Sequence, residues 1–212
     1  MNARGRLPIR AALGVLAALV CTAALAAAFA GAHKNGPVNV NPGAATNIAP
    51  SASDSRAAFL QVYKVFTSPR CQNCHPSGDA PLQGDDSHVH AQFVKRGSDG
   101  HGVYGMRCDT CHQVQNTPGP NMPPGNPKWG LPPPEHKMVF VGRTPAQLCR
   151  QLKDPKQTGG RSLAQLLTHV SSDDLVGWGW NPGDGRTLPP LSRDDTVAQM
   201  KIWIDGGAAC PE

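Results

Sequence analysis

The amino-acid sequence contains few aromatic residues, since Phe, Trp and Tyr make up 5% of its 212 positions. It also has few stretches in which apolar and polar residues alternate, the pattern that is typical of a half-buried strand. A large β-sheet domain is therefore not expected. Pro and Gly are frequent instead, with 21 and 23 copies, and they favour long irregular segments between short helices.

A net basic surface is also missing once the first residues are set aside. Of the 20 Lys and Arg residues, three arginines lie within residues 1–32, which contain no Asp or Glu, so 17 basic residues stand against 15 acidic ones in the remainder. This near balance removes the electrostatic basis for binding nucleic acid.

Residues 1–32 have the pattern of a secretory signal peptide. The arginines precede an apolar run over residues 11–31, and Ala28-Phe29-Ala30 resembles a cleavage site. The run is long, so it could instead stay as an N-terminal membrane anchor. Residues 33–53 are rich in Asn, Gly, Pro, Ala and Ser, which predicts a flexible linker. The folded domain is expected over residues 54–212, in the bacterial periplasm.

Two short stretches of the same form, C-x-x-C-H, lie in this domain. Two thiols at this spacing can bind the two vinyl groups of one porphyrin, and the next residue, a His, can bind its iron. We therefore predict two covalently attached haem c groups, held by Cys71, Cys74 and His75 and by Cys108, Cys111 and His112. A zinc site and a thioredoxin-like redox pair are the alternatives, although neither requires a His directly after the second Cys.

Two further cysteines, Cys149 and Cys210, remain after Cys21 is assigned to the signal segment. In an oxidising compartment they are expected to form a disulfide, and the alternative is two separate buried thiols. No cysteine is then left for an iron–sulfur cluster.

We expect His75 and His112 as the proximal ligands of the two irons. Several residues are candidates for the second axial ligand of each iron. The candidates are His88, His90, His101, His136 and His169, with Met106, Met122, Met138 and Met200. We favour His90, in a segment free to fold back over a haem, and His169, on a short apolar helix. Met138 comes next, because it follows a proline-rich segment.

An arginine precedes the first Cys of each motif, at Arg70 and Arg107. Both could donate hydrogen bonds to haem propionates. The alternative is that both are solvated surface side chains.

Helix start signals and apolar periodicity predict four helices, from about Asp54, Thr144, Ser162 and Ser192. Eight prolines within residues 117–135 exclude a regular helix or central strand there, although Trp129 could cover a haem face. Cys71 and Cys108 are 37 positions apart, which favours one fold around both haems. We predict a mostly α, small di-haem cytochrome c-like domain with short helices and long Pro/Gly-rich irregular segments, in which the haems supply apolar core.

The sequence resembles a family of small bacterial di-haem c-type cytochromes known as isoquinoline 1-oxidoreductase subunits. The resemblance extends over roughly residues 56–211 and rests on the segments 71–76, 83–86, 96–100, 108–112, 151–155 and 178–180. It implies a cytochrome that accepts electrons from a molybdenum or related dehydrogenase and does not itself oxidise isoquinoline.

These observations predict an electron carrier rather than an enzyme, with a dehydrogenase as donor and the respiratory chain as acceptor. Contact with the membrane is expected only through an uncleaved N-terminal segment. Two alternatives stay open: a peroxidase-like di-haem enzyme with one open iron and His101 or His136 as acid/base, and a haem-based redox sensor.

Overall fold

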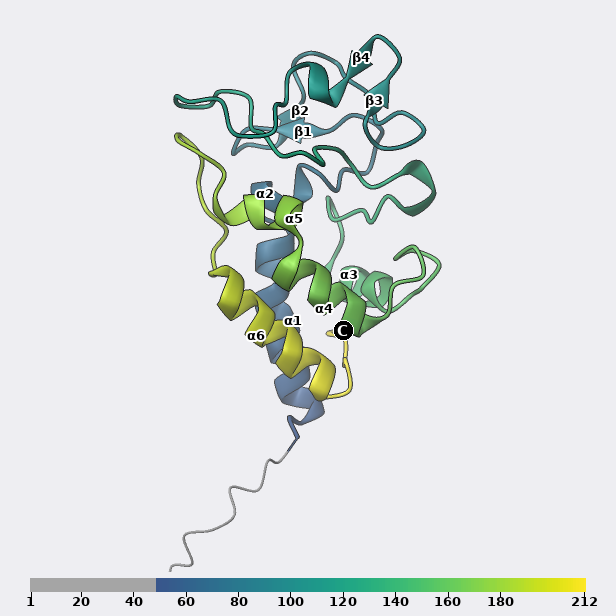
Figure 1. Cartoon of the computed structure of the whole chain (residues 1–212). Helices are drawn as coiled ribbons and strands as arrows, with labels where there is room; N and C mark the ends of the chain where they lie inside the picture. Colours follow the sequence, from purple (N-terminus) through teal and green to yellow (C-terminus); the bar gives the residue numbers. More distant parts are fainter. Residues whose placement is uncertain (1–48) are drawn as a thin grey trace, which may run out of the picture. The chain divides into compact units, whose positions relative to one another are not determined.

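The computed structural model describes residues 49–212, and Figure 1 shows how their elements are arranged. The predicted signal peptide or anchor, residues 1–32, and most of the predicted linker, residues 33–53, lie outside the described residues. No helix within residues 49–212 is long and apolar enough to cross a membrane. The described part is rich in helices and has only two-residue strands, so the predicted mostly α fold class is confirmed.

Two long helices, α1 (Ala52–Phe66) and α6 (Arg193–Asp205), pack side by side and form the centre of the core. α1 begins two residues before the predicted start, because Ser51 and Asp54 form a capping box that satisfies free backbone N–H groups. The rings of Phe59 and Trp203 lie 4.9 Å apart between the helices. The buried Ser55 hydroxyl donates to the Trp203 carbonyl at 2.7 Å, which fixes how the two helices are aligned.

Three further helices complete this helical part: α3 (Pro145–Leu152), α4 (Leu163–Ser172) and the short α5 (Asp174–Gly177). Thr144 and Ser162 form the predicted capping boxes of α3 and α4. α3 packs on α1 and α4 packs on α6. Their buried side chains, among them Leu148, Leu152 and Leu166, join the same apolar cluster.

Cys149 of α3 and Cys210 near the C-terminus form a disulfide. This is the pair that the sequence predicts. The Lys153 ammonium also donates to the Ala208 carbonyl, at 2.8 Å. Both links fasten the tail after α6 to α3.

The middle of the chain is irregular, as its prolines and glycines predict. It begins with the one-turn helix α2 (Pro69–Gln72) and contains two antiparallel pairs, β1 (Leu82–Gln83) with β2 (His88–Val89) and β3 (Gly102–Val103) with β4 (Met106–Arg107). Short 3₁₀ turns are η1 (Cys108–Thr110), η2 (Pro134–His136) and η3 (Trp178–Trp180). The two strand pairs lie above the helices in Figure 1.

Gly100 joins the segment between the two C-x-x-C-H stretches to the proline-rich segment. Its carbonyl accepts from Leu131 N at 2.8 Å, and its φ of +84° is in the left-handed region, which favours glycine. A Cβ at this position would lie 2.0 Å from the Leu131 carbonyl oxygen, so only glycine permits this close approach.

Candidate functional site

The first C-x-x-C-H stretch leaves the helical core directly after α1. Ser68 and Pro69 end that helix and begin α2, which carries Cys71. Cys74 and His75 follow at the end of this turn, where backbone bonds from Cys74 N to Cys71 O and from His75 N to Gln72 O keep the chain coiled. The two thiols and the imidazole therefore belong to one compact loop.

His75 is held in a fixed orientation by residues 138–140. Its Nδ1 is 2.8 Å from the Met138 carbonyl oxygen, and because a carbonyl only accepts, Nδ1 must carry the proton. The ring stacks on Phe140 at 4.0 Å and 17°, and Phe140 stacks in turn on Phe66 of α1. This arrangement leaves Nε2 as the nitrogen that can bind a metal.

Burial lowers the pKa of His75 to about 4, even though the bond to the Met138 carbonyl acts in the opposite direction. The imidazole is therefore neutral at pH 7, and the neutral form is the one that binds metal ions.

A cavity of about 890 Å³ opens in front of this loop. Apolar side chains from α1, α4, α5 and the proline-rich segment make up most of its wall, and its size suits a cofactor. The charged, sulfur-containing and imidazole side chains on its wall include Arg70, Cys71, Cys74, His75, Asp99, His101, Lys128, His136, Met138, Arg161 and His169.

The two thiols in this cavity are poor nucleophiles. Burial raises the pKa of Cys71 to about 12 and that of Cys74 to about 11. A thioredoxin-like pair needs a thiol whose pKa is lowered, so these values argue against the redox-pair alternative.

The second C-x-x-C-H stretch repeats the histidine geometry of the first. His112 Nδ1 lies 2.8 Å from the Pro124 carbonyl oxygen, and the ring stacks on Trp129 at 4.7 Å and 14°. In both stretches the proline-rich segment or the residues just after it supply the carbonyl and the aromatic ring. Both histidines therefore keep Nε2 for a ligand bond.

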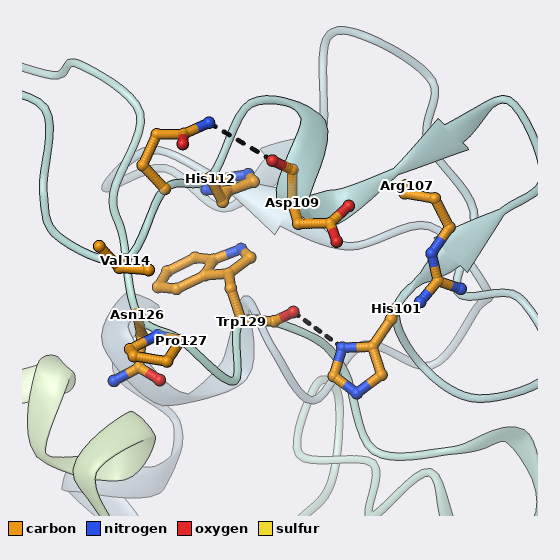
Figure 2. Close-up of a pocket in the computed structure, with 9 residues that line it drawn as sticks. His101, Arg107, Asp109, His112, Val114, Asn126, Pro127 and Trp129 are labelled. Atoms are coloured by element: carbon orange, nitrogen blue, oxygen red, sulfur yellow. Dashed lines mark hydrogen bonds between the residues drawn. The ribbon is translucent and has the colours of Figure 1, made fainter.

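The surroundings of His112 are more open than those of His75. Figure 2 shows His112 beside Trp129. Both line a small cavity of about 150 Å³, which His101 also lines. Cys108 is half-buried and Cys111 is exposed. The second stretch therefore lies at the protein surface.

The two favoured distal candidates lie near different proximal histidines. His90 has its ring centroid 6.2 Å from that of His112, at an angle of 66°. His169 lies on the wall of the larger cavity together with His75, and its Nδ1 is 3.6 Å from Asp173 Oδ2. His90 thus follows the first motif in sequence but lies beside the histidine of the second.

Among the remaining candidates, Met138 also lines the larger cavity, but its carbonyl is the group that accepts from His75 Nδ1. This places its backbone behind the His75 ring, away from Nε2, and favours His169.

His88 is exposed and its Nδ1 is 2.6 Å from Asp86 Oδ1. His101 Nδ1 is bonded to the Trp129 carbonyl, whereas the buried His136 Nδ1 has no hydrogen-bond partner within residues 49–212.

Arg70 is a buried side chain, so its interpretation as a solvated surface arginine is wrong. Its side chain is 3% exposed and donates to Asp85 Oδ1 at 2.6 Å and to the Gly84 carbonyl at 3.2 Å. Asp85 Oδ2 accepts from Thr187 N, which also ties the later Pro/Gly segment to this loop. Arg107 pairs with Asp99 and is about half-exposed.

Replacing Asp85 with asparagine is expected to lower the free energy of unfolding by about 2 kcal/mol, because it leaves the buried Arg70 cation without its counter-charge. The estimate is at the low end for a broken pair since Asp85 itself is 39% exposed. Urea unfolding followed by circular dichroism measures the change. Asp86→Asn is the matched control, since this exposed neighbour pairs with the exposed His88, and it should unfold like the wild type. Equal stability of the two variants would contradict the role given to Asp85.

Within residues 49–212, no group of three or more His, Cys, Asp or Glu side chains is arranged to hold a metal ion. A structural zinc site takes four such ligands, and the four thiols are not gathered into one. Comparisons with protein-family models, with curated proteins and with solved structures gave no match.

Proposed function

We propose that the protein is a di-haem c-type cytochrome that carries single electrons in the periplasm, from a dehydrogenase to the respiratory chain. The observation that carries this proposal is the repeated histidine geometry. In both C-x-x-C-H stretches a backbone carbonyl accepts from Nδ1, at 2.8 Å, and an aromatic ring stacks on the imidazole. A histidine held in this way presents Nε2 to a metal.

The residues present fit two haem groups. Cys71, Cys74 and His75 would hold one in the cavity of about 890 Å³, where the apolar wall excludes water. The other would be held by Cys108, Cys111 and His112 near the surface, which leaves it accessible to a redox partner. Haem supplies one-electron chemistry when it is bound, and the axial ligands set its potential over a range of about 0.8 V.

His90 is the distal ligand that we propose for the haem at His112. The centroids of His90 and His112 are 6.2 Å apart. A metal–nitrogen bond is about 2.0 Å long, so two imidazoles at this spacing would be near enough to hold one iron between them. For the haem at His75 we propose His169, which lines the same cavity and whose Nδ1 is 3.6 Å from Asp173 Oδ2.

The proposal is tested by counting covalently attached haems. The protein is expressed with a c-type cytochrome maturation system, and haem is measured by intact mass and by the pyridine haemochrome spectrum. Two haems are expected in the wild type. The Cys71→Ala/Cys74→Ala and Cys108→Ala/Cys111→Ala variants should each keep one.

Cys149→Ala/Cys210→Ala is the matched control, because it also removes two cysteines but should keep both haems. A wild-type protein with four free thiols and no haem would overturn the proposal.

A peroxidase-like enzyme is the second candidate, and one observation favours it. The buried His136 Nδ1 has no partner within the described residues, and His136 lies on the wall of the cavity that contains His75. An acid/base at that place would need an open iron. Rapid binding of cyanide or peroxide by the resting protein would support the enzyme, whereas entirely low-spin ferric spectra would support the carrier.

A further inference from the structure

A series of aromatic rings runs from the second C-x-x-C-H stretch to the wall of the larger cavity, which the first stretch also lines. The His112 imidazole stacks on Trp129 at 4.7 Å, and Trp129 meets Trp178 edge to face, with centroids 4.8 Å apart and planes at 88°. Trp178 lies on the wall of the larger cavity, together with Cys71, Cys74 and His75. Each ring in the series is therefore in contact with the next.

Hydrogen bonds hold this series in place. Trp178 Nε1 donates to Asn116 Oδ1 at 2.8 Å. The same oxygen accepts from Gly125 N at 2.9 Å, and Gly125 directly follows Pro124, whose carbonyl accepts from His112 Nδ1. Asn116 thus links Trp178 to the loop that orients His112.

We propose that Trp129 and Trp178 couple the two haem sites electronically and provide the route by which single electrons pass between them. This inference rests on the proposed function. In each transfer one iron is oxidised from ferrous to ferric and the other is reduced from ferric to ferrous by the same electron. No proton moves and no covalent bond changes. Tunnelling falls steeply with distance and is faster through packed atoms than across gaps, so contacting π-systems favour this route.

The test compares leucine variants of three tryptophans in the holoprotein. Trp129→Leu and Trp178→Leu break the series. Trp180→Leu is the control, because Trp180 also lies on the wall of the larger cavity but its Nε1 donates to the Leu191 carbonyl and its ring is not part of the series. Rapid photoreduction of part of the haem followed by transient absorption measures the rate of electron exchange between the two sites.

The exchange rate is expected to fall by at least an order of magnitude in Trp129→Leu and Trp178→Leu and to stay unchanged in Trp180→Leu. Trp178→Phe should restore most of the rate, since it keeps a ring while it loses the bond to Asn116. If a leucine variant fails to fold, the phenylalanine variants at both positions are compared with the wild type instead. The exchange rate should fall less in them than in the leucine variants.

Midpoint potentials and electron paramagnetic resonance spectra are recorded for every variant, so that each change in exchange rate can be compared with any change in the haems themselves. The inference is overturned if both haems are present and the exchange rate is unchanged in Trp129→Leu and Trp178→Leu. It is also overturned if the rate falls equally in all three leucine variants, or if its fall is explained by a shift in midpoint potential. Absence of haem would instead refute the proposed function, so the two failures are distinguishable.

Discussion

Replacing His90 with alanine is expected to convert one of the two haems from low-spin to high-spin. The ring centroid of His90 is 6.2 Å from that of His112, and if His90 is the distal ligand, as we propose, its loss would leave that iron with an open position. Added imidazole should enter the opened position and restore the low-spin spectrum. Optical and electron paramagnetic resonance spectra of the ferric protein measure the change.

His88→Ala is the matched control for this variant. His88 is two positions away and exposed, and its Nδ1 is bonded to Asp86, so its loss should leave both haems low-spin. His169→Ala tests the other haem and should open the iron at His75. If His90→Ala stays entirely low-spin, then another side chain is the ligand opposite His112.

Removing the disulfide with Cys149→Ala/Cys210→Ala should lower the free energy of unfolding by about 4 kcal/mol. The two cysteines are 61 positions apart, and a bridge that closes a loop of this length removes that much chain entropy from the unfolded state. Because Cys149 is fully buried in the core, replacement by alanine also loses a few packing contacts. Urea unfolding of both proteins, monitored by circular dichroism, gives the difference.

A wild-type protein reduced by dithiothreitol before unfolding serves as a second reference, since it lacks the bridge but keeps both side chains. It should unfold close to the double variant. A variant that is as stable as the oxidised wild type would show that the tail is held by other contacts, such as the Lys153 bond to the Ala208 carbonyl.

The helices could be predicted from the sequence because their signals are local. Ser51, Thr144, Ser162 and Ser192 each bond to a backbone N–H three residues on, so a few neighbouring residues determine where each helix starts. The pairing of Cys149 with Cys210 could be predicted by elimination. Neither inference needed the tertiary structure.

The surroundings of the two histidines could not be predicted, because they depend on contacts across irregular chain. Phe140 stacks on His75 from a segment far along the sequence, and no periodicity marks it in advance. The sequence also could not tell which proximal histidine His90 would approach. The same holds for Arg70, whose burial depends on Asp85 in a turn that has no regular pattern.

The disulfide has a consequence for the maturation that we propose. Cys149 and Cys210 are bonded to each other, whereas haem attachment would need Cys71, Cys74, Cys108 and Cys111 as thiols. Within each C-x-x-C pair the two thiols are near enough in sequence to oxidise with each other, and such a bond would block haem attachment. Under the proposed function, oxidation would therefore have to be selective for Cys149 and Cys210. A helical core that closes early would bring Cys149 and Cys210 together and bury their bridge, while the irregular part of the chain stays open to the attachment machinery.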